Sequence, residues 1–197
     1  MFSQEIFATD RRVARTQKAL REALHSLVRE KDYDDIAVKE ILDRANVGRS
    51  AFYSHFRDKD DLLASTIHDI IEPLHLAERG AAGSQSEKLL WFSLPIFKHH
   101  DGHRWTAALK MGPRARAILH EHLRRCLVDL IGRQANKSRR EIRGTSGTIP
   151  IVLMVEYLAS TFILVLEWWL ETESSLSAEQ VDHLFRSLVQ PTLAAKG

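Results

Sequence analysis

The sequence predicts an all-α fold, for two reasons. Along most of the 197 residues, apolar side chains recur at the three- and four-residue spacing of amphipathic helices. Only five prolines and nine glycines interrupt this spacing, and runs of alternating β-branched residues are few. We expect two domains, a three-helix unit with a helix-turn-helix at residues 1–58 and a larger helical domain at residues 59–197.

Composition narrows the class of protein. Hydrophobic residues make up 44% of the chain and charged residues 27%, as in ordinary globular proteins. The net charge of +2 means that any surface for nucleic acid must be a local patch. The single cysteine, Cys126, excludes an intrachain disulfide, and the N-terminus lacks the apolar core of a signal peptide. We therefore expect a cytoplasmic protein.

A first helix is expected after a loose arm at residues 1–10. Its apolar stripe runs through Leu20, Ala23, Leu24, Leu27 and Val28. Four cations precede this stripe: Arg11, Arg12, Arg15 and Lys18. A solvated helix face is the ordinary explanation of such a run. The alternative, contact with DNA phosphates, gains weight because a helix-turn-helix candidate follows. Tyr33 and Ile36 connect to that candidate and are expected in its core.

The stretch Val38–Phe56 has the pattern of two short helices joined by a tight turn. Asn46 follows the first helix and tolerates the left-handed conformation found after helix ends. In the second helix, Phe52 and Phe56 share one face and are expected in the core. The side chains on its remaining faces are small, polar or cationic, which suits contact with the major groove of DNA. Apolar residues of the first helix fall on one face: Val38, Ile41, Leu42 and Ala45.

Four segments carry a specific pattern: Ile36-Ala37-Val38-Lys39-Glu40-Ile41, Ala45-Asn46-Val47-Gly48-Arg49-Ser50, Phe52-Tyr53-Ser54-His55-Phe56 and Lys59-Asp60-Asp61-Leu62. With these segments, the region from about Arg12 to Leu63 resembles the N-terminal domain of the TetR-like family of bacterial transcription regulators. Two positions depart from the family pattern. Ala37 stands where a capping Thr is common, which should weaken that cap by about 1 kcal/mol. Asn46 replaces a common Gly and is conformationally tolerable.

The resemblance implies a double-stranded DNA operator as partner. It assigns base edges to Arg49, Ser50 and Ala51. It assigns phosphates to Tyr53, His55 and Lys59, to which the cations Arg11, Arg12 and Arg15 are added.

A further helix is expected to link the two domains. Asp58 is its candidate N-cap, and acidic residues in the first turn suit the helix dipole. The apolar pattern continues to Ile71, and Pro73 should kink or end the helix. Residues 78–86 are small and polar and are expected to form a loop.

The second domain begins with an apolar, aromatic stretch at Leu89–Phe97, followed by a histidine-rich polar turn. His99, His100 and His103 lack the spacing of a zinc motif, so we expect solvated histidines and no metal or cofactor. A long amphipathic helix is predicted at Pro113–Gln134, with Cys126 and His122 as packed residues on its apolar face. The basic residues 133–148 are expected to form a surface loop.

Ile149–Leu170 is the most apolar stretch and is long enough to span a membrane. Because Glu156 lies inside it, we expect a buried central helix and no membrane contact. The last helix starts with a capping box at Ser177–Gln180, and Pro191 should stop it. Together these two helices could form a homodimeric four-helix bundle, as in the family. The residues expected at that interface are Val181, Leu184, Phe185 and Leu188.

The predicted function is a homodimeric repressor that a small molecule releases from its operator. An apolar effector pocket could be lined by Trp91, Phe92, Phe97, Trp105, Met111, Met154 and Phe162. Aromatic residues at helical spacing are, however, more often plain core.

Two alternatives stay open: a DNA-binding regulator without a small-molecule effector, and an enzyme. The enzyme is the remoter one, because no recognisable nucleophile–base set or glycine-rich phosphate loop is present.

Overall fold

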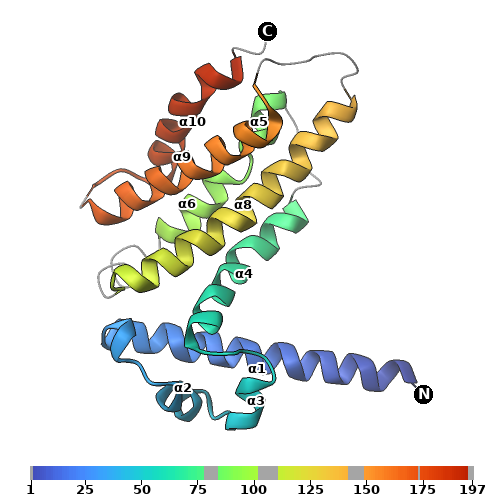
Figure 1. The fold of residues 1–197 in the computed structure, drawn as a ribbon, viewed down its shortest axis with the longest axis vertical. Helices are drawn as coiled ribbons and strands as arrows, with labels where there is room; N and C mark the ends of the chain where they lie inside the picture. The colour runs from blue at the N-terminus through green and yellow to red at the C-terminus, as the bar shows by residue number, and fades with distance from the viewer. Residues whose placement is uncertain (1, 78–83, 102–110, 142–148, 173, 195–197) are drawn as a thin grey trace. The chain divides into compact units, whose positions relative to one another are not determined.

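The computed structural model describes residues 2–77, 84–101, 111–141, 149–172 and 174–194 (Figure 1). Throughout these residues the secondary structure is helical, which confirms the predicted all-α class. The helices are α1 (Phe2–Glu30), η1 (Tyr33–Asp35), α2 (Val38–Ala45), α3 (Arg49–Tyr53), α4 (Lys59–Ala77), α5 (Gln85–Leu90), α6 (Ser93–Asp101), α8 (Pro113–Glu141), α9 (Ile151–Glu171) and α10 (Ala178–Ala194).

The described chain forms two compact units. Unit 1 comprises the residues up to Ile67 together with 111–119, and unit 2 comprises the rest. Helices α4 and α8 therefore each contribute residues to both units. This division differs from the predicted ranges 1–58 and 59–197. The reason is packing: Leu62 and Leu63 of α4 and Ala115 of α8 are buried in the same core as α1 and α2.

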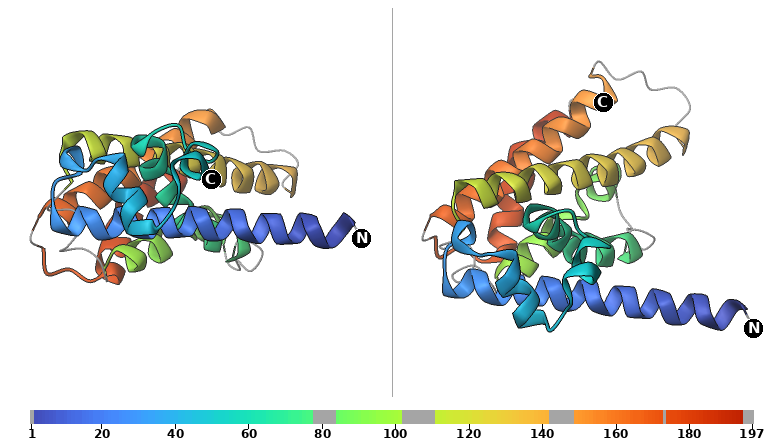
Figure 2. Two further views of the ribbon diagram at one scale, coloured as in Figure 1. Left: turned by 90° about the horizontal axis from the view of Figure 1, so that it is seen from below. Right: turned by 60° about the horizontal axis from the view of Figure 1, so that its bottom comes forward.

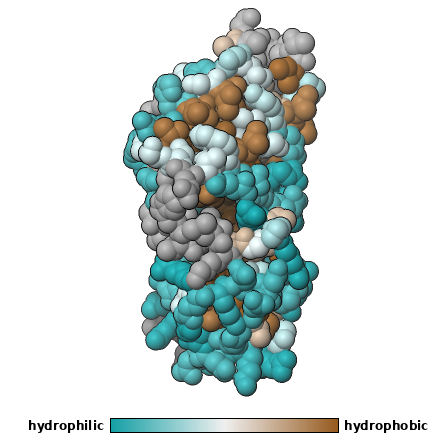
Figure 3. Space-filling view, turned by 90° about the vertical axis from the view of Figure 1, so that its left-hand side faces the viewer, coloured by the Kyte–Doolittle hydropathy of each residue, from teal (hydrophilic) through white to brown (hydrophobic). Residues whose placement is uncertain are grey.

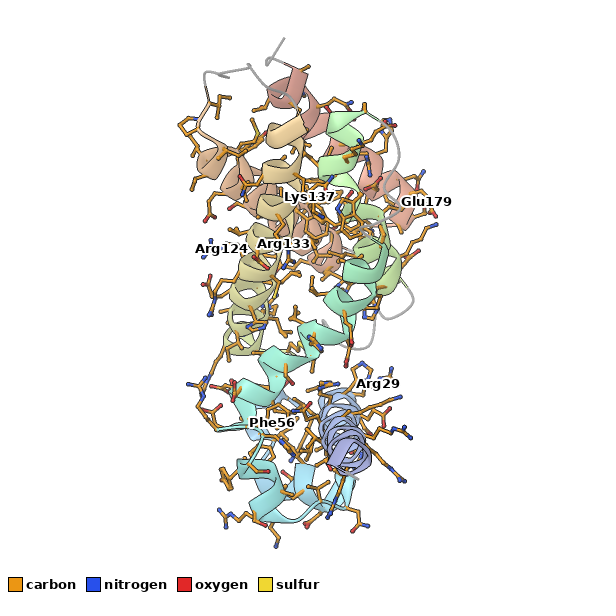
Figure 4. The ribbon with its side chains drawn as sticks, turned by 90° about the vertical axis from the view of Figure 1, so that its right-hand side faces the viewer. Arg29, Phe56, Arg124, Arg133, Lys137 and Glu179 are labelled. Atoms are coloured by element: carbon orange, nitrogen blue, oxygen red, sulfur yellow. The ribbon has the colours of Figure 1, made fainter. Side chains whose placement is uncertain are left out.

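Unit 1 is built on the C-terminal half of α1, against which α2 packs (Figures 1 and 2). The predicted core positions of Tyr33, Ile36, Phe52 and Phe56 are confirmed, with at most 6% of each residue exposed. Phe56 lies between α3 and the first turn of α4, where Figure 4 labels it. Burial of such side chains contributes about 1.5–3 kcal/mol each and fixes α3 on the unit.

Several predicted helix ends are confirmed. Asn46 adopts the left-handed conformation (φ 52°, ψ 48°) that closes α2. The carboxylate of Asp58 accepts the backbone N–H of Asp61 at 2.8 Å, as an N-cap. Ser177 and Gln180 form the predicted capping box, with reciprocal bonds of 2.9 and 3.4 Å.

Helix α2 begins at Ala37 without a side-chain cap, as expected from the missing Thr. Half of a capping box remains, because Glu40 accepts the backbone N–H of Ala37 at 2.9 Å.

Three predicted boundaries are wrong. The helix α1 begins at Phe2, where a loose arm was expected, and α8 continues to Glu141 through part of the expected loop. Pro191 lies inside α10 and does not end it. Pro73, which was expected to kink or end its helix, lies inside α4. A proline inside a helix costs about 3 kcal/mol. Leu74 and Leu193, each directly or shortly after a proline, are buried, and this burial offsets part of the cost.

Unit 2 has an aromatic core. The rings of Phe92, Phe97, Phe162 and Phe185 pack with centroid separations of 4.7 to 6.5 Å. They come from α6 and its preceding turn, α9 and α10, so the cluster joins these helices. The ion pair Arg124–Glu156 (2.8 Å) and the contact between the His120 ring and the Glu167 carboxylate (2.6 Å) hold α8 beside α9. Arg124 and Arg133 project from α8 in Figure 4.

A buried polar cluster also joins α6 to α10. Ser93 donates to the carboxylate of Asp182 at 2.5 Å, and Arg186 pairs with the same carboxylate at 2.6 Å. Arg186 also donates to the Leu90 carbonyl at 3.0 Å. Each polar group therefore has a partner, as burial requires.

Among the described residues, α9 is long and apolar enough to cross a membrane by length and composition. Nine of its side chains, from Met154 to Trp169, are buried within the protein. The remaining side chains of α9 are partly or fully exposed, so this helix is buried on one side and not on most sides as expected.

Candidate nucleic-acid interface

The outer surface of α3 is polar and cationic. Phe52 is fully buried on the inner side, whereas Arg49, Ser50 and Tyr53 are exposed and Ala51 is partly buried. The guanidinium carbon of Arg49 lies 5.8 Å from the centroid of the Tyr53 ring. This surface offers hydrogen-bond donors and a small apolar group, the contacts by which a helix reads base edges in the major groove.

Charged pairs fix α2, the helix before the turn, against α1. Arg44 forms a bidentate pair with Glu30 at 2.7 and 2.9 Å and also donates to Ser26. Lys31 contacts both carboxylate oxygens of Glu40 at 2.6 and 2.8 Å. Exposed pairs contribute little stability singly. Together, however, they restrict how α2 and the turn lie on α1.

The cations of α1 are available for phosphates. Arg11, Arg12 and Arg15 are exposed on the helix, and His55 is partly exposed after α3. The structure thus presents the predicted phosphate-contacting side chains, apart from Lys59, at the surface of unit 1.

Lys59 has a different role from the predicted one. Its ammonium group donates to the carbonyl oxygens of Tyr33 (2.7 Å), Asp34 (3.1 Å) and Ile36 (2.9 Å). It also lies 4.4 Å from the centroid of the Tyr33 ring. A lysine has three N–H donors, and all three are used inside the domain. Lys59 therefore stabilises the end of η1, contrary to the expected phosphate contact.

Beside Lys59 lies a second polar group, which we call the Asp60 clamp: Tyr33, Asp60 and Arg114. The hydroxyl of Tyr33 donates to one carboxylate oxygen of Asp60 at 2.5 Å, and Arg114 donates to the other at 2.5 Å. It joins η1, α4 and the first turn of α8 within unit 1. No local sequence pattern indicated this role for Arg114, which lies 54 residues beyond Asp60.

The pKa values of Tyr33, Asp60 and the neighbouring Lys59 are shifted from their ordinary values. Burial, and then the hydrogen bond to Asp60, raise the pKa of the Tyr33 hydroxyl above its ordinary value. Burial opposes ionisation of Asp60, but the hydrogen bonds from Tyr33 and Arg114 outweigh it, and the pKa of the carboxyl is lowered. Burial lowers the pKa of Lys59. The ionised carboxylate is thus the form that the clamp stabilises.

The family described as "Bacterial regulatory proteins, tetR family" matches residues 20–66, which all lie in unit 1. A curated relative, an uncharacterized HTH-type transcriptional regulator YxbF of Bacillus subtilis (strain 168), is 38% identical over 73 residues. That alignment covers 34% of this chain and 19% of the relative, so the chain matches about a fifth of the relative's length.

Solved structures match nearly the whole chain. A TetR transcriptional regulator from Streptococcus agalactiae 2603V is 26% identical, covers 93% of this chain and 98% of its own, and has a TM-score of 0.55. The structure of RolR in complex with the ligand resorcinol is 18% identical, covers 95% and 94% of the two chains, and has a TM-score of 0.62.

Residues 20–66 are thus a DNA-binding domain of the TetR type, and nearly the whole chain resembles a TetR transcriptional regulator in fold. The matched region, residues 20–66, is the part of such regulators that binds DNA.

The described residues predicted to line an effector pocket differ in their surroundings. Phe92, Phe97 and Phe162 pack against one another in the core, and Met154 is 2% exposed. Trp91 is only partly buried. Met111 packs on the core of unit 1. Trp105 lies outside the described residues.

The predicted dimer-interface residues separate into two groups. Val181 and Phe185 are fully buried inside unit 2, so they cannot lie on an interface. Leu188 is 51% exposed and Leu184 is partly exposed. The error arose because an amphipathic stripe marks the buried face of a helix, whether one chain or two cover it.

The histidine-rich segment is helical where it is described. His99 and His100 lie in the last turn of α6, where a polar turn was expected, and His103 lies outside the described residues. Within the described parts of the chain, no group of three or more His, Cys, Asp or Glu side chains could hold a metal ion. Burial raises the pKa of the Cys126 thiol, which keeps it in its unreactive form.

Proposed function

We propose that the chain is a TetR-family regulator, a cytoplasmic homodimer that represses transcription until a small molecule binds it. The observation that carries the proposal is the polar, cationic surface of α3 above the buried Phe52. Two such helices in a dimer would enter major grooves about 34–36 Å apart, or a multiple of this, on a pseudo-palindromic operator.

On the operator, Arg49, Ser50 and Ala51 contact base edges. The phosphates are contacted by Tyr53 and His55 and by the α1 cations Arg11, Arg12 and Arg15. Phosphate contacts position the protein, and base contacts determine the sequence that is bound.

The test is selection of bound duplexes from a random DNA pool with the purified full-length chain, followed by affinity measurements at several salt concentrations. We expect an inverted repeat to be enriched. Each phosphate contact that is lost, as in Arg15→Ala, should weaken binding to all sequences. It should also reduce the slope of log binding constant against log salt concentration by about one. An unenriched pool, or binding independent of salt, would contradict the proposal.

An exposed apolar face supports the dimer. Among the described residues, six large hydrophobic side chains are exposed, and all but Tyr53 lie on α9 or α10. Leu153, Leu164 and Trp168 lie along one face of α9, at steps of eleven and four residues. The Tyr157 hydroxyl donates to the carbonyl of Leu188 at 3.2 Å, which places the exposed Leu188 beside this face. Figure 3 shows apolar residues gathered on a face of unit 2.

The small-molecule effector rests on weaker support, namely the fold shared with RolR, whose structure contains resorcinol. We place the effector in unit 2, whose interior is apolar and aromatic. Since α4 and α8 belong to both units, a change in unit 2 has a continuous backbone route to unit 1. The effector must bind the DNA-free state more tightly, or it shifts nothing.

A regulator without an effector is the second candidate, and the tight ring packing of unit 2 favours it. A screen of small aromatic compounds, read by thermal shift and by release from the selected operator, separates the two. Compounds that raise the melting temperature and release DNA support the effector.

A further inference from the structure

We propose that Arg49 reads a guanine in each half of the operator, and that the ring of Tyr53 holds its guanidinium in position before DNA arrives. This inference rests on the proposed DNA binding and names what the recognition surface selects.

The geometry begins in the core of unit 1. Phe52 is fully buried, and its ring meets that of Tyr53 edge-on, with centroids 5.2 Å apart and an interplanar angle of 87°. Tyr53 is itself half exposed, so its outer face is open to the neighbouring side chain. Arg49 precedes it by one helical turn, and its guanidinium carbon lies 5.8 Å from the ring centroid. This distance lies within the range of a cation–π contact.

The chemistry of the exposed side chains identifies the base. Arg49 is the single cation within α3, and its planar guanidinium can donate two parallel hydrogen bonds. Guanine presents two acceptors, O6 and N7, at matching spacing in the major groove. Ser50 has one hydroxyl and Ala51 one methyl group, so neither can make such a bidentate contact. The hydroxyl of Ser54 already donates to the Ala51 carbonyl at 2.8 Å.

The ring contact adds order to a long side chain. A free arginine loses many rotamers when it binds, and this loss opposes binding. An arginine already held over an aromatic ring loses fewer. Tyr53 is thus a positioning residue for Arg49, in addition to its hydroxyl contact with phosphate.

The experiment uses the full-length chain and a random DNA pool, with one sequence preference measured per variant. We expect the wild-type motif to contain one guanine per half-site whose replacement weakens binding about 5- to 150-fold. Arg49→Ala should lose the preference at that base pair and keep the others. A motif without such a guanine, or an Arg49→Ala variant weakened equally on every sequence, would overturn the guanine assignment in favour of phosphate contact.

The role of the Tyr53 ring is tested separately. Tyr53→Phe keeps the ring and should keep the guanine preference, although its overall affinity falls. Tyr53→Leu removes the ring and should reduce that preference about 2- to 5-fold. Equal preference in both variants would overturn the positioning role. Thermal unfolding of each variant verifies that α3 is still packed. If the wild-type chain enriched no DNA, the proposed function and this inference would both fall, whereas enrichment without guanine overturns only the inference.

Discussion

Three carbonyl oxygens surround the ammonium group of Lys59, so its loss should affect the fold before it affects DNA contacts. Lys59→Met keeps the apolar stem but leaves these acceptors without their donor. We expect the free energy of unfolding to fall by about 1–3 kcal/mol, measured by urea denaturation.

The matched control is Arg15→Met, a change to an exposed cation of α1. It should leave stability within about 0.5 kcal/mol and weaken DNA binding across sequences. If Lys59→Met left stability unchanged and reduced only DNA affinity, Lys59 would be a phosphate contact after all.

The Asp60 clamp makes unit 1 sensitive to acid. The pKa of Asp60 is lower in the folded chain than its ordinary value of about 4, so its contribution is complete above that value and is lost as the pH falls through the folded pKa. Asp60→Asn should lower stability at pH 7 and show a smaller further loss below about pH 4 than the wild type. Urea midpoints from pH 3 to 7 measure both effects. Asp43→Asn, an exposed change on α2, is the control, and an Asp60→Asn curve parallel to the wild type would contradict the clamp.

Helices α9 and α10 carry the prediction about assembly. Leu164 is 62% exposed on α9, and a charge there should dissociate the dimer without unfolding the chain. We expect Leu164→Glu to sediment as a monomer with helical circular dichroism preserved. Val181→Glu should instead unfold unit 2, because Val181 is fully buried.

Gln190→Glu is the control for added charge on α10, since position 190 lies about 200° around the helix from Leu188. It should remain dimeric. A Leu164→Glu protein that sediments as a dimer would place the interface elsewhere.

The sequence predicted a helix end correctly where the residue that determines it contacts its own neighbours in the chain. Asn46 at the end of α2, Asp58 before α4 and Ser177 before α10 act through neighbouring backbone groups, so their roles followed from the sequence. Pro191 was misleading because the local pattern does not show that α10 continues past it to Leu193, which is buried.

The candidate site was predictable to the same extent. The exposed positions Arg49, Ser50 and Tyr53 followed from the four-residue spacing of Phe52 and Phe56, which share the buried face. The partners of Lys59 and the pairing of Asp60 with Arg114 did not, because these contacts join segments 23 to 54 residues apart.

At the scale of the whole molecule, unit 1 is discontinuous in sequence. The family pattern covers residues 20–66, yet Ala115 is fully buried in the same core, and Ile118 and Leu119 pack against it. Removing these side chains from the core would expose apolar surface on α4 and α1, and each lost buried methylene group costs about 0.8 kcal/mol.

This arrangement limits how such regulators can be recombined. A chimera that joins this DNA-reading segment to another regulator's sensor after Ile67 would take over a foreign α8, and with it an unmatched residue opposite Asp60. A compatible chimera requires two crossover points, one in α4 and one after Leu119. The first turns of α8 are then transferred together with the rest of unit 1. Exchange of operator specificity between family members, by engineering or by gene recombination, is therefore expected to succeed most often when that short second segment is exchanged too.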